Sequence, residues 1–405
     1  MEWWQQAAPL ALDTLRTSPY PLRPLTPSVR MTNTGKLLSE LIALPSVNPA
    51  FLPVEDTRAG ERRVAEFLAA VAANSGLDVE LQEVLPHRSN LIARLSPPGR
   101  VCRRILLVPH LDTVNAEPGQ FHPRRKNGRL FGRGACDTKG SVAAMLDALR
   151  EIARSGRRPR ETEIVFAGVV DEENAQAGSR ALAAAGFKAD LAIVGEPTRL
   201  EVVTAHKGSL WLRLETRGKS AHGARPELGR NAVHEMARIV DALETDYAAG
   251  LRKRRHPLLG SATVSVGTIN GGTQPNIVPD RCAATIDRRT LPGETEVSVQ
   301  REIRSFLRQR RLRAAFGSGK SAPCLPMETR ADLPLVRQFL RQAGRRRSVG
   351  ADYFCDAAVL AGAGIPSIVF GPGDIAQAHT VEEWISIKAL ERGHSLLLRF
   401  LRSLP

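Results

Sequence analysis

The chain has 405 residues and a formal charge of +15, because 57 Lys and Arg stand against 42 Asp and Glu. A single hydrophobic core stops growing at roughly 250–300 residues, so we expect two or three domains. Hydrophobic residues make up 42% and charged residues 24%, which is typical of folded proteins and excludes a disordered chain. The charge surplus alone leaves open nucleic acid, an anionic membrane, an anionic substrate or solubility as its reason.

We expect neither a membrane span nor a secretion signal in this sequence. No apolar run approaches the ~20 residues that a bilayer span needs, and the first residues lack a basic segment followed by an apolar one. The 5 cysteines are odd in number and widely spaced, without a CxxC pair. We therefore expect no disulfide framework, no membrane partner and a reducing, cytoplasmic location.

In chain order, the first segment is expected to be a disordered extension over residues 1–35. Prolines at positions 19, 21, 24 and 27 prevent a helix there. An amphipathic run over 37–44 follows, so we expect the folded chain to begin near Met31.

Beyond the extension, short apolar strands alternate with amphipathic helices. The patterns predict strands at 104–108, 163–170, 191–194 and 367–370, and helices at 141–153, 178–185, 333–343 and 387–401. Such alternation predicts an α/β domain with a mostly parallel sheet that is covered by helices on both faces.

The middle of the chain has a different pattern. Apolar and polar residues alternate over 209–217, 263–269 and 282–286, and helices are predicted at 229–243 and 296–307. This order resembles an α+β ferredoxin-like unit. We therefore expect a domain inserted over 207–315, which splits a catalytic domain into 36–206 and 316–405.

Acidic residues and histidines follow the predicted strands. In an open α/β sheet, ligands bind beyond the carboxyl ends of the strands. The groups at those ends and in the loop before the helix at 141–153 are His110, Asp112, Asp137, Asp171, Glu172, Glu173, Glu196 and His379. One such carboxylate alone is usually a helix cap or a solvated charge. Because so many converging carboxylates cannot all stay ionised, we expect two divalent metal ions, with zinc first and cobalt or manganese as alternatives.

Nine stretches, taken together and in order, resemble one known family. They are PHLDTV at 109–114, GRGACDTKG at 132–140, DEEN at 171–174, GEPT at 195–198, HKGS at 206–209, SAH at 220–222, NIVPD at 276–280, DRRTLPGE at 287–294 and FGPGDIAQAH at 370–379. The chain resembles the dinuclear zinc amidohydrolases and peptidases that include acetylornithine deacetylase, succinyl-diaminopimelate desuccinylase, aminoacylase and glutamate carboxypeptidase. The resemblance covers about residues 36–403.

The resemblance implies a ligand set for the two metals. Asp137 would bridge them, His110 and Glu196 would complete one site, and Glu173 and His379 the other. It also implies a cis peptide bond after Asp137.

The resemblance further implies a hydrolytic mechanism for an amide bond. Asp112 would orient His110 by accepting its remaining N–H. Glu172 would be the general base, taking a proton from the attacking water and passing it to the leaving amine. Asp112 and Glu172 are therefore expected in the catalytic group.

The inserted domain is expected to add three residues to the site. By resemblance, His222 acts across the interface of a homodimer and stabilises the oxyanion in the partner subunit. Asn276 and Arg288 match positions that bind the substrate. Strand alternation lets only one of Arg288 and Arg289 face the site, and we expect Arg288.

The stretches at 195–200, 206–209 and 370–379 are more similar to the deacetylase and desuccinylase branch than to the carboxypeptidase branch. N-acetylornithine is therefore the first expected substrate, and succinyl-diaminopimelate, other N-acyl amino acids and short peptides are the alternatives. The Phe354-Cys355-Asp356 stretch departs from the small-residue versions of this loop.

Two other classes of function are alternatives to an amidohydrolase. A catalytically inactive binding protein would lack a ligand or the base, and none is missing. Nucleic-acid binding is suggested by basic clusters at 157–160, 252–255, 308–313 and 345–347. Aromatic residues, which stack on single-stranded bases, are absent from these clusters, so we expect no nucleic-acid partner.

Overall fold

A computed structural model of the chain describes residues 31–319 and 324–405. Most of the expected extension, residues 1–30, lies outside the described residues. Helix α1 (Asn33–Ile42) begins inside the segment that was assigned to the extension, and the hydroxyl of Thr32 caps it by accepting the N–H of Gly35 at 3.2 Å. Across the described ranges, no helix is both long and apolar enough to cross a membrane.

A nine-stranded sheet forms the centre of the larger part of the fold. Its strands are β1 (Asp78–Leu85), β2 (Arg88–Leu95), β3 (Arg103–Pro109), β6 (Thr162–Gly168), β7 (Leu191–Gly195), β8 (Val203–His206), β15 (Met327–Glu328), β16 (Val349–Ala351) and β17 (Ser367–Val369). Their order is β1-β2-β6-β3-β7-β17-β8-β15, and β16 pairs with β8. The central strands β6, β3, β7 and β17 run parallel, while β1, β2 and β15 pair antiparallel at the two sides.

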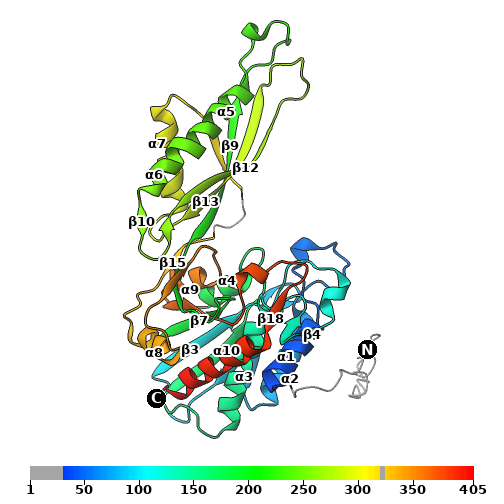
Figure 1. Cartoon of the computed structure of the whole chain (residues 1–405), viewed down its shortest axis with the longest axis vertical. Coiled ribbons are helices and arrows are strands. Elements are labelled where there is room, and N and C mark those ends of the chain that lie inside the picture. The colour runs from blue at the N-terminus through cyan, green and yellow to red at the C-terminus, as the bar shows by residue number, and fades with distance from the viewer. Residues whose placement is uncertain (1–30, 320–323) are drawn as a thin grey trace, which may run out of the picture. The chain divides into compact units, whose positions relative to one another are not determined.

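Helices cover both faces of this sheet (Figure 1). The core on one face is formed by α1, α2 (Arg62–Ala73), α3 (Lys139–Arg154), α8 (Pro334–Gln342) and α10 (Ile387–Arg402), and the core on the other by α4 (Ala177–Ala184) and α9 (Ala357–Gly362). Strand β3 serves both, since Ile105 and Leu107 belong to the first core, while Leu106 and Val108 belong to the second. The predicted α/β architecture is confirmed.

A four-stranded antiparallel sheet and its helices form a smaller domain with its own hydrophobic core. Its elements in chain order are β9 (Gly208–Arg217), α5 (Ala232–Ala242), a π-helical turn (Leu243–Tyr247), α6 (Ala248–Arg252), β12 (Thr263–Gly271), β13 (Arg281–Thr290), α7 (Glu296–Gln309) and β14 (Ala315–Ser318). The strand order β12-β13-β9-β14 is that of a ferredoxin-like unit, as predicted. This unit extends to Ser318, a few residues beyond the expected limit at 315.

The remaining elements are short. They are the strands β4 (Arg124–Lys126), β5 (Arg129–Phe131), β18 (Trp384–Ser386), β10 (Arg255–His256) and β11 (Gly260–Ser261), and 3₁₀ turns at Pro49–Phe51, Pro118–Phe121, Pro226–Leu228 and Ile375–Gln377. Strands β18, β5 and β4 form a three-stranded sheet. This sheet joins the segment before the loop of Asp137 to the segment that follows His379.

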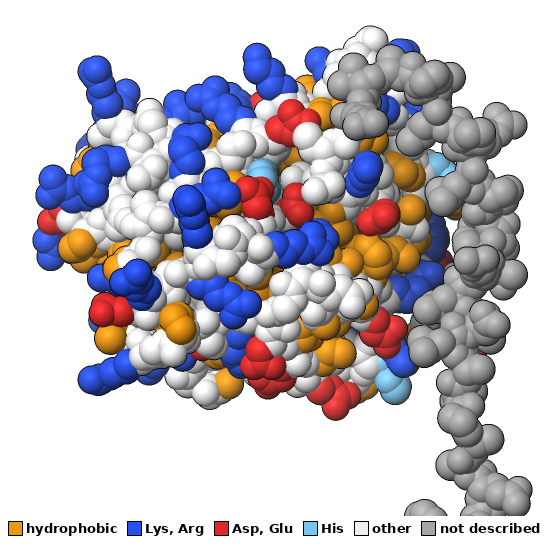
Figure 2. All heavy atoms as spheres, turned by 90° about the horizontal axis from the view of Figure 1, so that it is seen from below, with side chains coloured by type: hydrophobic (Ala, Val, Ile, Leu, Met, Phe, Trp, Pro, Cys, Tyr) orange, Lys and Arg blue, Asp and Glu red, His pale blue; other side chains and the backbone are white. Residues whose placement is uncertain are grey.

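Basic side chains are spread over the face of the molecule that Figure 2 shows. Acidic and apolar side chains lie between them, so this face carries no uniform basic stripe. A protein that binds a nucleic-acid backbone usually gathers its Lys and Arg on one face or along one groove. The distribution on this face therefore gives the nucleic-acid alternative no support.

Candidate metal centre

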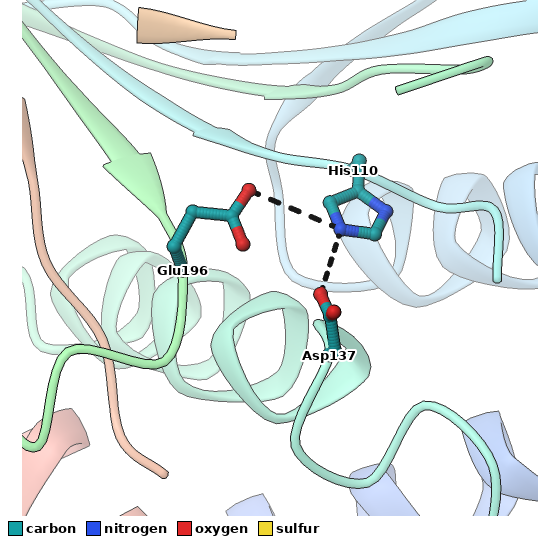
Figure 3. Close-up of side chains that lie close together, drawn as sticks. All are labelled: His110, Asp137 and Glu196. Carbon is teal, nitrogen blue, oxygen red and sulfur yellow. Dashed lines mark hydrogen bonds and ion pairs between the residues drawn. The ribbon is translucent and has the colours of Figure 1, made fainter. Parts of the chain in front are cut away.

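Two groups of candidate ligands meet beyond the carboxyl ends of the central strands. His110, Asp137 and Glu196 form one group, and Asp137, Glu173 and His379 form the other; within each, the ligand atoms lie within 4.8 Å of one another. His110 follows β3 and Glu196 follows β7, as Figure 3 shows for the first group. The fold thus brings together the five residues that the sequence analysis named as metal ligands, at the edge of the sheet where ligands are expected to bind.

Asp137 belongs to both groups through different oxygens. Its Oδ1 lies 3.1 Å from Nε2 of His110, and its Oδ2 lies 3.3 Å from Nε2 of His379. Nε2 of His379 is also 3.2 Å from Oε2 of Glu173, and Nε2 of His110 is 3.9 Å from Oε1 of Glu196. A carboxylate shared in this way can bridge two cations, and imidazole nitrogen with carboxylate oxygen is a donor set that suits zinc.

Electrostatics in the two groups favour bound cations. Burial raises the pKa of Glu196 well above its usual range and also raises that of Glu173. Burial opposes the charge on Asp137 as well, but hydrogen bonds from His110 and His379 lower its pKa. Carboxylates bind a metal ion in their ionised form, which burial disfavours at Glu196 and Glu173. Divalent cations would supply the positive charge that stabilises this ionised form.

Asp112 connects His110 with the turn that carries Glu172 and Glu173. Its carboxylate is fully buried and accepts the backbone N–H of Glu172 and of Glu173, each at 3.1 Å, and the amide of Asn48 at 2.8 Å. Nδ1 of His110 lies 3.0 Å from the main-chain oxygen of Asp112 and 3.4 Å from its Oδ1. Asp112 therefore contacts His110 as expected, mainly through its backbone, and it also holds the turn that carries the two glutamates.

Glu172 lies beside both groups without belonging to either. Burial raises the pKa of Glu172 well above its usual range, and the charges of Glu196, Asp356 and Glu173 add to the effect. Within residues 31–319 and 324–405, its carboxylate makes no hydrogen bond or ion pair. A half-buried carboxylate with a raised pKa and free oxygens can take up and release a proton.

The loop that presents Asp137 is held by a residue that sequence reasoning missed. The peptide bond between Asp137 and Thr138 is cis, as expected. The carboxylate of Glu383, which is 1% exposed, accepts the backbone N–H of Gly134, Cys136 and Asp137 and also the guanidinium of Arg133, at 2.8 to 2.9 Å. Nothing in the sequence distinguishes Glu383 from the exposed Glu382 beside it.

A second missed residue is Asp356, at the start of α9. It is 1% exposed, accepts a hydrogen bond from the hydroxyl of Ser179, and has its pKa raised to about 6 by burial. It belongs to the Phe354-Cys355-Asp356 stretch that departs from the family pattern.

The three residues that the small domain was expected to add to the site lie in two separate places. His222 and Asn276 are exposed and lie together, since His222 pairs with Ile277 and the N–H of Gly223 donates to the oxygen of Asn276 at 2.7 Å. The contacts described for His222 all lie within the small domain.

The position of Arg288 contradicts the expectation that this residue faces a substrate. It is fully buried on the helix-covered side of β13, where its guanidinium donates to Glu294 at 2.6 Å, to Tyr247 at 3.3 Å and to the main chain of Arg289. Arg289 lies on the opposite side of the strand, next to Asp287 at 2.9 Å. The alternation of the strand therefore places Arg289, and not Arg288, on the side of β13 that faces away from the core of the small domain.

Comparisons with known proteins agree with this geometry. Residues 106–403 match the family described as peptidase family M20/M25/M40. Acetylornithine deacetylase of Myxococcus xanthus is 32% identical over 350 residues, 82% of this chain and 90% of that protein. Acetylornithine deacetylase of Proteus mirabilis (strain HI4320) is 29% identical over 383 residues, 91% of this chain and 96% of that protein.

Solved structures share the fold at lower identity. Aminopeptidase PepT from Bacillus cereus superposes with a TM-score of 0.74 at 23% identity, covering 91% of this chain and 97% of that one. The M20 family metallo-carboxypeptidase Sso-CP2 from Sulfolobus solfataricus gives 0.71 at 18% identity, covering 92% and 99%. At these identities the likeness shows the fold.

Proposed function

The chain belongs to peptidase family M20/M25/M40 and is a metal-dependent hydrolase, and we propose that it removes the acyl group from an N-acyl amino acid, with N-acetylornithine as the first substrate. The observation that carries the proposal is the arrangement of Asp137 between two ligand groups with the free carboxylate of Glu172 beside them. The branch of the family is supported by two acetylornithine deacetylases at about 30% identity over most of the chain.

His110, Asp137, Glu173, Glu196 and His379 would hold two divalent cations, with zinc first and cobalt or manganese as alternatives. When bound, such cations polarise an amide carbonyl and lower the pKa of a water molecule.

The proton transfers fall to Glu172. Its carboxylate takes a proton from the attacking water, and burial, which raises its pKa, favours the protonated form that this transfer produces. It then gives the proton to the leaving amine, so that a neutral amine departs. Asp112 keeps the base in place by holding the backbone N–H groups of Glu172 and Glu173.

The small domain would complete the site as part of a homodimer. Strand β12 is at the edge of its sheet, and Ile269 and Ile277 expose 49% and 36% of their surface. We propose that residues 207–318 form a lid and dimerisation domain, which brings His222 to the oxyanion in the partner subunit. Asn276 and Arg289 then bind the substrate carboxylate, since a guanidinium suits a carboxylate.

The five cysteines are free thiols, which supports a reducing compartment such as the cytoplasm as the proposed location.

The test is a hydrolysis panel with added zinc or cobalt. It compares N-acetylornithine, succinyl-diaminopimelate, N-acetylmethionine and a dipeptide, and N-acetylornithine should give the highest kcat/KM. Glu172→Gln should keep its metal content and lose roughly 10²- to 10⁴-fold in kcat. No turnover of any compound by the zinc-loaded protein would refute the proposed activity, and faster turnover of another compound would replace the proposed substrate.

A further inference from the structure

A buried ion pair lies behind the turn that carries Glu172. Glu61 directly precedes α2, and Arg88 is the first residue of β2. The guanidinium of Arg88 donates from Nε to Oε2 of Glu61 at 2.7 Å and from Nη2 to Oε1 at 2.6 Å. The carboxylate of Glu61 is fully buried, and the side chain of Arg88 is 12% exposed. The pair is therefore bidentate and shielded from water, which fixes both side chains.

This pair holds Asp171 at two points. Oε1 of Glu61 accepts the backbone N–H of Asp171 at 3.1 Å, and Nη2 of Arg88 lies 3.0 Å from Oδ1 of Asp171. Asp171 has a φ of 68°, in the left-handed region that residues other than glycine rarely adopt. Contacts to both the main chain and the side chain stabilise this conformation, and the conformation sets the direction in which the next residues leave the strand.

The contacts continue from Asp171 to the site itself. Nδ2 of Asn48 donates to Oδ1 of Asp171 at 3.0 Å and to Oδ2 of Asp112 at 2.8 Å. Asp112 in turn accepts the backbone N–H groups of Glu172 and Glu173. A continuous series of hydrogen bonds thus connects Arg88 with the backbone of both glutamates.

We propose that Arg88 and Glu61 are positioning residues for the catalytic turn: through Asp171 they place the carboxylate of Glu172 for proton transfer and that of Glu173 for the second metal. The inference rests on the proposed function for its kinetic part and on the ligand geometry for its metal part. Arg88 contacts neither the candidate ligand atoms nor Glu172 in the interactions described for it, so it acts only through its neighbours.

Energetic reasoning favours a positioning role over simple stabilisation. Two buried carboxylates, those of Glu61 and Asp171, share one guanidinium, and burial raises the pKa of Glu61 even with Arg88 beside it. A buried ion pair is often no more stabilising than apolar side chains of the same volume. What it adds here is a fixed geometry for Asp171.

The chain contains a matched control. Arg104 and Glu163 form another ion pair between neighbouring strands, near the starts of β3 and β6, whereas the site lies beyond the ends of those strands. Arg104 also donates to the main chain of Lys188 at 3.0 Å. Arg104→Met therefore removes a comparable arginine–glutamate pair from the same sheet without touching the site.

The experiment compares Arg88→Met, Arg88→Lys and Arg104→Met with the unmodified chain. Zinc binding is followed by equilibrium dialysis, kcat and KM are measured on N-acetylornithine, and denaturant midpoints report stability. For Arg88→Met we expect the affinity for one of the two zinc ions to fall about 10- to 100-fold, with the other unchanged. We also expect kcat to fall about 10- to 100-fold and KM to change less than about 3-fold. Arg88→Lys should recover part of both losses, and Arg104→Met should change only the denaturant midpoint.

Two results would overturn the inference. One is an Arg88→Met variant that binds two zinc ions as the unmodified chain does and keeps its kcat. The other is a loss of kcat in Arg104→Met as large as in Arg88→Met, which would reduce the effect to general stability. If Arg88→Met does not fold, Arg88→Lys decides by the same readouts. Should the unmodified chain hydrolyse no compound of the panel, the proposed function fails, while the zinc affinities still test the positioning role.

Discussion

The substitution Glu383→Gln tests how the loop of Asp137 is held. Glu383 uses Oε2 for the guanidinium of Arg133 and the N–H of Gly134, and Oε1 for the N–H groups of Cys136 and Asp137. A glutamine has the same shape but only one acceptor oxygen. Its amide nitrogen must therefore face two of these four donors in either orientation.

The loss can be estimated from the bonds. A hydrogen bond to a charged group contributes about 1.5–3 kcal/mol, so two lost bonds cost about 3–6 kcal/mol. This is a large part of the roughly 5–15 kcal/mol by which a folded protein is stable. Because Asp137 is shared by both ligand groups, a displaced loop should also weaken the binding of both metal ions.

The assay is urea denaturation of Glu383→Gln and of Glu382→Gln, with and without zinc. Glu382 is the neighbouring residue, its side chain is 76% exposed, and its ion pair with Arg124 is 3.6 Å long. Exposed pairs contribute about 0–1 kcal/mol, so Glu382→Gln should leave stability nearly unchanged. A free energy of unfolding for Glu383→Gln within about 1 kcal/mol of the unmodified chain would refute the reasoning.

Three further predictions concern other parts of the molecule. Arg289→Met should raise KM at least about 10-fold with little effect on unfolding, whereas Arg288→Met should cost about 3 kcal/mol in urea denaturation, since it leaves Glu294 without its buried partner. Burial lowers the pKa of His206 to about 4 from 6.5, so its native state resists protonation while the unfolded chain does not. As the pH falls from 6.5 to 4, the free energy of unfolding of the unmodified chain should therefore fall by about 3 kcal/mol more than that of His206→Gln. Equal dependence of the two unfolding free energies on pH would contradict this. Chelation should abolish hydrolysis, added zinc should restore it, and far-UV circular dichroism should stay unchanged, since both cores of the large sheet are apolar.

The fold was predictable where the pattern is local. Strands such as β3 and β7 are short runs of buried apolar residues, and helices such as α3 and α10 have apolar residues at helical spacing. Strand β1 was missed because all of its side chains are exposed or half-buried, so its sequence lacks an apolar run. The ligand positions followed from topology, since parallel strands end at one edge of a sheet.

The supporting residues were not predictable in the same way. Glu383 and Asp137 are far apart in sequence, and only the pairing of β18 with β5 brings the segment after His379 to the loop of Asp137. The same holds for Arg88 and Asp171, which meet because β2 pairs with β6. No spacing rule connects residues whose contact depends on such pairings.

The choice between Arg288 and Arg289 shows a signal that was present. Cys282, Ala284 and Ile286 alternate along β13 and belong to the core of the small domain. Arg288 is in phase with them, so it lies on the buried side, and Arg289 lies on the other. The alternation along the strand therefore predicts that Arg288 is buried, because the apolar side of the strand is the side that the helices cover.

The net charge of +15 and the acidic site are compatible because they act over different distances. At physiological ionic strength, exposed charges are screened over about 8 Å. The net charge of the whole surface therefore contributes little to the electrostatic potential at any one site. The candidate centre gathers three carboxylates and two imidazoles within two groups of atoms. Without cations such a centre repels a substrate that carries a carboxylate. Bound divalent metals would reverse the local charge, so the same ions that activate water would also make the site receptive to an anionic substrate.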